Sequence, residues 1–251
     1  MNIDQLHQQY QEKGCVFLPN YYSQDDMTKI SALVDQMEHQ EYEHAYKYYD
    51  ENVKDGSQTL TRIEHCLGNI PELDKLVLND GLVEMIETFL EDKASLFKDK
   101  INFKLPGGKP DLLHQDQAAG WGDYAENFLS VAIFLDDNTK ENAAMSVLNT
   151  GDYPKTLIEG EWELMKNPEP PFLPEENYDL LEGKAGSLVF FDAYVPHGSP
   201  ANLSDKRRRN MFLSYNKQSQ GDHRDQYYAD KLASYPPNNM RATDKTYTYR
   251  V

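Results

Sequence analysis

The chain has 251 residues, with 25 basic and 42 acidic side chains and a formal net charge of −17 at pH 7. A surface of this charge repels nucleic-acid backbones and anionic lipid headgroups, so we expect neither nucleic acid nor a membrane as a partner. The length fits one β-sandwich or barrel domain with added elements, spanning residues 1–251.

The amino terminus and the cysteines predict a cytoplasmic protein. The first residues contain neither a basic start nor an apolar run, and no stretch of about 18 apolar residues occurs later. Cys15 and Cys66 are too few for a disulfide framework, and neither belongs to a Cys-x-x-Cys pair. We therefore expect both thiols to pack as small hydrophobic groups in a reducing compartment. The sequence leaves the oligomeric state open.

Two helical segments are predicted in the first part of the chain. Residues 23–26 read SQDD and resemble a capping box, and the apolar positions that follow recur at helical spacing: Met27, Ile30, Leu33, Val34 and Met37. A second helical stripe runs from about Pro71 to Leu90, with a turn at residues 79–81. We expect residues 1–95 to be mostly helical and to support a sheet.

The chain turns from α to β at about residue 96. Short apolar runs separated by Gly, Pro, Asn and Asp are typical of an antiparallel core, which we place at residues 96–216. Residues 128–135 read FLSVAIFL and residues 186–191 read GSLVFF, which is too apolar for strands with one face in water. Residues 152–181 are acidic and proline-rich and predict a long loop or lid, and residues 217–251 form a C-terminal extension.

Potential metal ligands stand in two segments of this predicted core. His114 and Asp116 are separated by one residue, so both project to the same side of an extended strand. His197 follows a buried-looking strand and could supply a third ligand. Two imidazoles and one carboxylate on one face of a metal leave the opposite positions open, as in iron(II) oxygenases. A His-x-Asp pair alone is weak evidence, because surface strands often contain one.

Arg208 adds a second chemical group to this pattern. It lies in a predicted strand over residues 207–213, whose alternation turns Arg208 away from Arg207 and Arg209. An inward guanidinium needs a carboxylate partner, because a lone buried charge is costly. Its planar fork suits a dicarboxylic cosubstrate. We interpret Lys206, Arg207 and Arg209 as parts of a solvated turn.

Four segments carry a pattern that extends over nearly the whole chain. They are residues 10–19, residues 103–108 leading into 114–116, residues 135–145, and residues 197–199 with Arg208. Together they resemble the phytanoyl-CoA dioxygenase (PhyH-like) family of iron(II)/2-oxoglutarate oxygenases. Asn142-Ala143 stands where this family usually has Asn-Gly. The resemblance implies a mainly β fold, a double-stranded β-helix (a cupin-like jelly roll) backed by the N-terminal helices, with iron at its open mouth.

The resemblance also implies the site and the reaction. It implies His114, Asp116 and His197 as the iron(II) ligands, Arg208 and Ser199 as the residues that hold 2-oxoglutarate, and Lys104 as a further cosubstrate residue. The implied reaction uses O2 to hydroxylate a small molecule and releases succinate and CO2, with ascorbate as an accessory reductant. An iron halogenase would lack the carboxylate ligand, whereas Asp116 is present.

The substrate prediction rests on residues 117–126, which directly follow the metal pair. This segment combines aromatic and acidic side chains, which suit a cation: Trp121, Asp123, Tyr124 and Glu126. We therefore expect a small polar substrate with an amine, and 2-aminoethylphosphonate is the leading candidate. Its phosphonate would need a cation such as Lys104 or Lys109. An acyl-CoA would need a basic landing surface, which an acidic chain does not suggest.

Three alternatives stay open from the sequence alone. The same ligands could hold zinc or manganese in a hydrolase or isomerase, or the fold could be a non-catalytic cupin-like domain that binds a metal or ligand. The enzyme could also hydroxylate another natural product or an acyl substrate, because one fold serves many substrates. Release of succinate from 2-oxoglutarate would separate an oxygenase from the first two.

Overall fold

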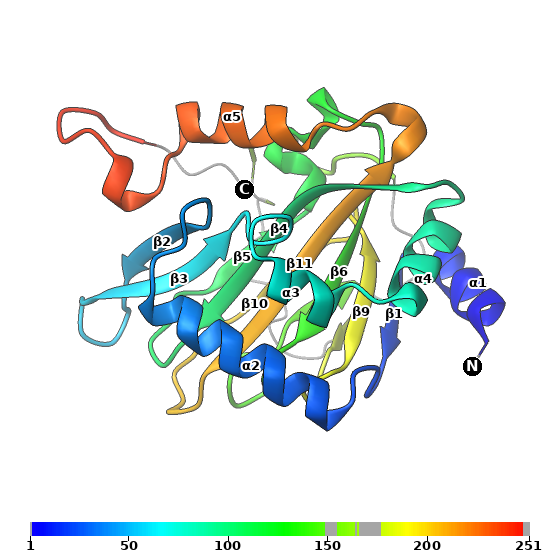
Figure 1. Cartoon of the computed structure of the whole chain (residues 1–251), viewed down its shortest axis with the longest axis horizontal. Helices are drawn as coiled ribbons and strands as arrows, with labels where there is room; N and C mark the ends of the chain where they lie inside the picture. The colour runs from blue at the N-terminus through cyan, green and yellow to red at the C-terminus, as the bar shows by residue number, and fades with distance from the viewer. Residues whose placement is uncertain (1, 149–154, 164, 166–176, 248–251) are drawn as a thin grey trace.

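The computed structural model describes residues 2–148, 155–163, 165 and 177–247. Its core consists of two antiparallel sheets (Figure 1). The larger sheet contains, in spatial order, β1 (Cys15–Leu18), β9 (Leu188–Asp192), β6 (Phe128–Phe134), β11 (Arg208–Lys217), β4 (Ala94–Lys104), β3 (Gln58–Glu64) and β2 (Tyr46–Glu51). The smaller sheet contains β5 (Asp111–His114), β10 (His197–Ser199), β7 (Ser146–Leu148) and β8 (Tyr178–Leu180). This is the mainly β jelly roll that the sequence predicted.

The N-terminal helices cover the outer face of the larger sheet. They are α1 (Ile3–Lys13), α2 (Gln24–His39), α3 (Pro71–Val77) and α4 (Asp80–Leu90), and α2 crosses in front of the sheet in Figure 1. Ser23 caps α2 by accepting a hydrogen bond from the backbone N–H of Asp26, and the five predicted apolar positions are all buried. Asn79 caps α4 in the same way, which divides the stripe from 71 to 90 into two helices.

The first part of the chain contains more strand than we expected. β1, β2 and β3 all lie within residues 1–95 and extend the larger sheet at its two edges. Residues 46–51 read YKYYDE and residues 58–64 read QTLTRIE, so neither shows a clear alternation of apolar and polar side chains. Pairing with the neighbouring strand, not a local pattern, makes these segments strands.

Strand β6 shows why its sequence is continuously apolar. All seven of its residues are buried. Leu129, Val131 and Ile133 pack with the helices, while Ala132 and Phe134 face the smaller sheet and pack with Val147 there. A strand covered on both faces is apolar at nearly every position, and Ser130 is the polar exception in β6. The prediction of a packed double layer is confirmed.

The predicted loop over residues 152–181 lies only partly within the described residues, because residues 152–154, 164 and 166–176 are outside them. Its last part forms β8, at the edge of the smaller sheet. The Gln115 side chain donates a hydrogen bond to the Thr156 carbonyl (3.0 Å) and accepts one from the Ile158 N–H (2.8 Å). The described segment 155–163 is therefore tied to the chain beside Asp116.

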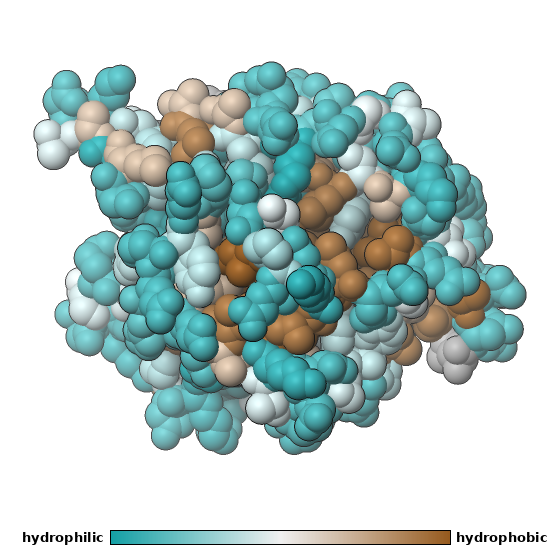
Figure 2. Space-filling view, in the orientation of Figure 1, coloured by the Kyte–Doolittle hydropathy of each residue, from teal (hydrophilic) through white to brown (hydrophobic). Residues whose placement is uncertain are grey.

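The C-terminal extension adds α5 (Arg224–Ser234), which packs against β4 and lies along one edge of the molecule in Figure 1. Figure 2 shows that this view of the surface is mostly hydrophilic, with apolar side chains gathered between the helices. None of the described helices is both long and apolar enough to cross a membrane.

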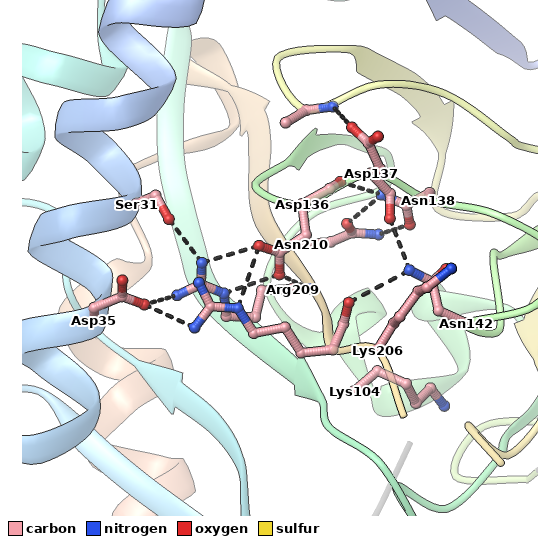
Figure 3. Close-up of polar contacts among 12 residues, drawn as sticks. Ser31, Asp35, Lys104, Asp136, Asp137, Asn138, Asn142, Lys206, Arg209 and Asn210 are labelled. Carbon is pink, nitrogen blue, oxygen red and sulfur yellow. Dashed lines mark hydrogen bonds and ion pairs between the residues drawn. The ribbon is translucent and has the colours of Figure 1, made fainter. Parts of the chain in front are cut away.

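A buried ionic cluster ties α2 to the larger sheet (Figure 3). The Arg209 guanidinium lies between Asp136 and the two α2 residues Ser31 and Asp35. Its Nε is 2.9 Å from Asp136 Oδ2, its Nη1 is 2.6 Å from Asp35 Oδ1, and its Nη2 donates to Ser31 Oγ at 2.8 Å. The cluster thus joins one strand of the sheet to the helix that covers it.

This cluster corrects one sequence interpretation and agrees with another. Arg209 has no exposed surface, so its assignment to a solvated turn is wrong. Only Lys206 and Arg207 have substantially exposed side chains there, at 62% and 40%. Arg208 is also buried, but alternation along β11 turns it to the opposite face, as the sequence predicted.

Replacing Arg209 with alanine should therefore destabilise the fold. Removal of one partner of a buried ion pair costs about 3–5 kcal/mol, and we expect the lower end because Asp35 is half-exposed. Urea unfolding followed by circular dichroism measures this loss. Arg207→Ala is the matched control and should cost less than about 1 kcal/mol, because its ion pair is exposed. Equal losses in the two variants would contradict this role for Arg209.

Candidate active site

His114, Asp116 and His197 converge in one place. Their ligand atoms all lie within 4.8 Å of one another, and no other such cluster of His, Cys, Asp or Glu occurs in the described parts of the chain. Asp116 Oδ1 is 3.7 Å from His114 Nε2 and 3.9 Å from His197 Nε2. These separations are too long for hydrogen bonds and fit three groups that can share one ion.

Neighbouring elements of the smaller sheet position this cluster. β5 and β10 pair with His114 directly opposite His197, which places the two ring centroids 4.4 Å apart. β5 ends at His114, and Asp116 begins a short 3-10 helix, η1 (Asp116–Ala119). We had placed His114 and Asp116 on one extended strand. Gln115 between them is still extended (φ −107°, ψ 130°), so the two side chains project to the same side as expected, and the chain turns only from Asp116 onward.

Hydrogen bonds fix the orientation of both imidazoles. His114 Nδ1 lies 2.6 Å from the Leu112 carbonyl, and His197 Nδ1 lies 2.9 Å from the Val195 carbonyl. A carbonyl only accepts, so each Nδ1 donates its proton there and each Nε2 faces the other ligands. Burial, followed by the nearby His114, lowers the pKa of His197 to about 4. His197 is therefore neutral at pH 7, as a metal ligand must be.

The Asp116 carboxylate is prepared for the same purpose. Ser130 Oγ donates a hydrogen bond to Asp116 Oδ2 at 3.1 Å, which leaves Oδ1 toward the histidines. Burial by itself would raise the pKa of Asp116. The interactions with His114 and His197 and the charge of Lys100 outweigh burial and hold this pKa well below its usual range. The side chain is thus an ionised ligand at neutral pH.

A basic group lies on the larger sheet, across from the metal cluster. Arg208 on β11 is directly opposite Lys104 on β4. Arg208 is 2% exposed, and its Nη2 donates to Ser199 Oγ at 3.2 Å. Within the described residues, Arg208 Nε has no hydrogen-bond partner. A buried guanidinium with an unused donor is costly unless an anion binds it, so this end of the site fits a carboxylate.

Asp111 neutralises the second cation at this end. Its Oδ2 lies 2.7 Å from Lys104 Nζ and accepts a hydrogen bond from Ser199 Oγ at 2.8 Å. Burial and the charge of Arg208 lower the pKa of Lys104 to about 8, although Asp111 opposes this change. Our sequence analysis did not identify Asp111, whose only signal is a carboxylate on the strand that ends at His114. Its pairing leaves Arg208 as the cation available to a ligand.

A cavity of about 540 Å³ joins the metal cluster to this basic end. More basic than acidic side chains line it. The five basic residues are Arg62, Lys100, Lys104, Lys109 and Arg208, and the three acidic residues are Asp50, Asp111 and Asp116. The chain as a whole has a net charge of −17. The basic lining is therefore a local feature, and it suits anionic ligands. Alternation of Lys100, Asn102 and Lys104 along β4 was the sequence signal for it.

The four residues that we expected to contact the substrate lie elsewhere. None of Trp121, Asp123, Tyr124 and Glu126 lines the cavity. The Trp121 ring is 2% exposed and packs against Phe128, with 5.2 Å between centroids. The Tyr124 hydroxyl donates a hydrogen bond to Asp230 of α5 at 2.7 Å. Successive 3-10 turns after Asp116 direct this segment toward α5, away from the metal cluster.

A different tryptophan lines the cavity. Trp162 comes from the segment 155–163, and its backbone N–H donates to the Ala118 carbonyl. Its ring lies against Gly120, where a Cβ atom would overlap the ring. Gly120 also has φ +77°, which favours glycine. Trp162 could not be predicted as a cavity residue, because its segment has no periodic pattern.

Comparison with known proteins agrees with this geometry. The family model for phytanoyl-CoA dioxygenase (PhyH) matches residues 10–210. The chain belongs to this family. A similar protein is a 2-aminoethylphosphonate dioxygenase from an uncultured bacterium, HF130_AEPn_1, at 29% identity over 96% of this chain and 91% of the relative. A methylphosphonate hydroxylase from Gimesia maris is 25% identical over 90% of this chain and 85% of its own.

Solved structures show the same fold. The EctD structure from S. alaskensis, which contains 2-oxoglutarate and 5-hydroxyectoine, superposes with a TM-score of 0.69 at 19% identity. The match covers 88% of this chain and 77% of EctD. The present PhyH-family protein is thus a 2-oxoglutarate-dependent dioxygenase, and its His-Asp-His cluster fits the iron(II) on which this family depends.

Proposed function

We propose that this enzyme uses O2 and 2-oxoglutarate to hydroxylate a small organophosphonate, with release of succinate and CO2. The observation that carries the proposal is the basic lining of the cavity in a strongly acidic chain. A phosphonate is a compact anion that such a lining suits. Two relatives with phosphonate substrates in their names support the choice, and 2-aminoethylphosphonate is the first candidate.

The cavity lining favours the phosphonate group of the substrate over its amine as the group that is recognised. The residues that suggested an amine lie outside the cavity, whereas the basic side chains line it. The volume of about 540 Å³ is in the range of small-ligand sites and accommodates a cosubstrate beside a small substrate. A long acyl chain with its coenzyme is much larger than such a space.

In this proposal each group has a defined role. His114, Asp116 and His197 hold iron(II), which supplies the oxidising chemistry when bound. Arg208 and Ser199 hold the distal carboxylate of 2-oxoglutarate, and this fixes how far the cosubstrate extends toward the metal cluster. Lys104, with Asp111 as its counter-ion, supports the same end. Apolar lining residues exclude water from the space between the two ends: Met145, Trp162 and Phe212.

A substrate panel tests the proposal. With iron(II), ascorbate and 2-oxoglutarate present, 2-aminoethylphosphonate and methylphosphonate should stimulate succinate release above the substrate-free rate, because a bound substrate completes the site. Ethylamine is the matched control that lacks the phosphonate, and it should not stimulate. Mass spectrometry should detect the hydroxylated phosphonate. Coupled turnover of an acyl-CoA, or equal stimulation by ethylamine, would exclude a phosphonate enzyme.

A further inference from the structure

The structure assigns Lys100 as the residue that binds the anionic group of the substrate, at a subsite separate from that of 2-oxoglutarate. This assignment rests on the proposed function, because it names the residue that would recognise the phosphonate. We infer it from the position of Lys100 on β4, from the lack of an ion pair or hydrogen bond to its ammonium among the described residues, and from its place in the same cavity as the metal ligands.

Strand β4 carries a row of polar side chains into the cavity. Lys100, Asn102 and Lys104 all line it, and they alternate along the strand, so they share one face. At about 3.3 Å per residue, the backbone of Lys100 lies about 13 Å from that of Lys104. In the pairing with β11, Lys104 is opposite Arg208, while Lys100 is opposite Phe212. The two lysines therefore serve different ends of the cavity.

The other basic side chains of the cavity already have partners. Lys104 pairs with Asp111 at 2.7 Å, Lys109 pairs with Asp50 at 3.0 Å, and Arg62 Nε lies 2.7 Å from Glu64 Oε1. Arg208 contacts Ser199 and is the cation that we assign to 2-oxoglutarate. Lys100 is the remaining basic side chain of the cavity, and these pairs and assignments do not account for its charge.

The Lys100 ammonium has neither a hydrogen bond nor an ion pair within the described residues. Its Nζ lies 5.1 Å from the centroid of the Phe212 ring, and the side chain is partly buried. Glu64 is opposite Lys100 in the pairing of β3 with β4, but Glu64 is engaged by Lys231 of α5 at 2.6 Å and by Arg62. No carboxylate among the described residues lies within ion-pair distance of this partly buried ammonium, and an anionic ligand would compensate its charge.

The position of Lys100 suits binding of the substrate better than a role in a structural ion pair. It lines the same cavity as His114, Asp116 and His197. An anion held by Lys100 would place the neighbouring carbon beside the metal cluster. The Asn102 amide, which has no hydrogen bond in the described part of the chain, lies next in the row and can donate to the same anion.

Titration of methylphosphonate tests this subsite directly. In a calorimeter and without oxygen, methylphosphonate is titrated into enzyme that is loaded with iron(II) and 2-oxoglutarate. Lys100→Met keeps the length of the side chain and its contact with Phe212, and it should raise the Kd for methylphosphonate by at least about tenfold. The Kd for 2-oxoglutarate should change less than about twofold. Lys100→Arg keeps the charge and should retain most of the affinity.

A neighbouring lysine provides the matched control. Lys93 directly precedes β4 and pairs with Glu87 on the surface, so Lys93→Met should change neither Kd. If Lys100→Met proves unstable, Lys100→Gln makes the same comparison. Unchanged methylphosphonate binding in these variants, an equal loss of 2-oxoglutarate binding, or no binding of methylphosphonate by the unaltered enzyme would each overturn the subsite. Binding through Lys100 without hydroxylation would overturn only the proposed reaction.

Discussion

Replacing Asp116 with alanine should lower the 2-oxoglutarate-dependent release of succinate by more than about 100-fold and reduce the iron content of the protein. Groups that only orient a metal ligand already contribute about 10–100-fold, so the loss of the single anionic ligand should exceed that range. Asp116 contacts Ser130 and the two histidines, not the hydrophobic core. The protein should therefore stay folded. Succinate assay, iron quantification and circular dichroism measure the three effects.

Ser130 offers the matched control for this variant. Ser130→Ala removes the hydrogen bond to Asp116 Oδ2 but keeps all three ligands, so activity should fall by about tenfold. His114→Ala and His197→Ala should behave like Asp116→Ala, because all three side chains face one point. Full activity with normal iron content in Asp116→Ala would show that the metal is held elsewhere.

The fold could be predicted where local pattern and tertiary packing agree. Helix α2 has a serine cap and five apolar positions at helical spacing, and both features reappear in the structure. Strand β6 is apolar at nearly every position because helices cover one face and the smaller sheet covers the other. The edge strands β2 and β3 have no such signal, because polar side chains occupy both of their faces. Only the pairing of β3 with β4 and of β2 with β3 makes them strands.

The metal cluster and Arg208 could be predicted because residue types and short spacings define them. The substrate contacts could not, because residues next to a ligand in sequence can lie far from it in space. The 3-10 turn 116–119 and Gly120, with φ +77°, separate Trp121 from the metal cluster. Trp162 reaches the cavity from a segment without a periodic pattern. Closeness to Asp116 in the sequence therefore did not predict which residues line the cavity.

One departure from the family pattern has a visible backbone consequence. Ala143 stands where the PhyH-like pattern has glycine, and the structure gives Ala143 a φ of +68°. Asn142 accepts hydrogen bonds from Thr139 N–H (2.8 Å) and donates to the Asp137 carbonyl (2.8 Å), which holds this turn. The turn therefore keeps the left-handed backbone conformation at Ala143, although alanine has a Cβ atom. This conformation costs about 1–2 kcal/mol for such a residue, and the surrounding hydrogen bonds offset that cost.

Replacing Arg208 with alanine should weaken the binding of 2-oxoglutarate by about 2–5 kcal/mol, the cost of removing a charge-assisted partner in a desolvated pocket. Lys104 cannot take over, because its ammonium is held by Asp111 at 2.7 Å and by the Lys109 carbonyl at 2.7 Å. The affinity for methylphosphonate should change little, since we place that anion beside Lys100, at the other end of the cavity. Calorimetry with each ligand separates the two effects.

Replacement of the neighbouring Arg209 tests whether 2-oxoglutarate binds on the face of β11 that carries Arg208. Arg209→Ala should destabilise the fold, yet the folded protein should keep its affinity for 2-oxoglutarate, because Arg209 points toward Asp35 and Asp136 beneath α2. Arg208→Lys should recover only part of the affinity, since a lysine keeps the charge but loses the planar pair of donors. If Arg209→Ala weakens 2-oxoglutarate binding and Arg208→Ala does not, the cosubstrate does not bind on the cavity side of this strand.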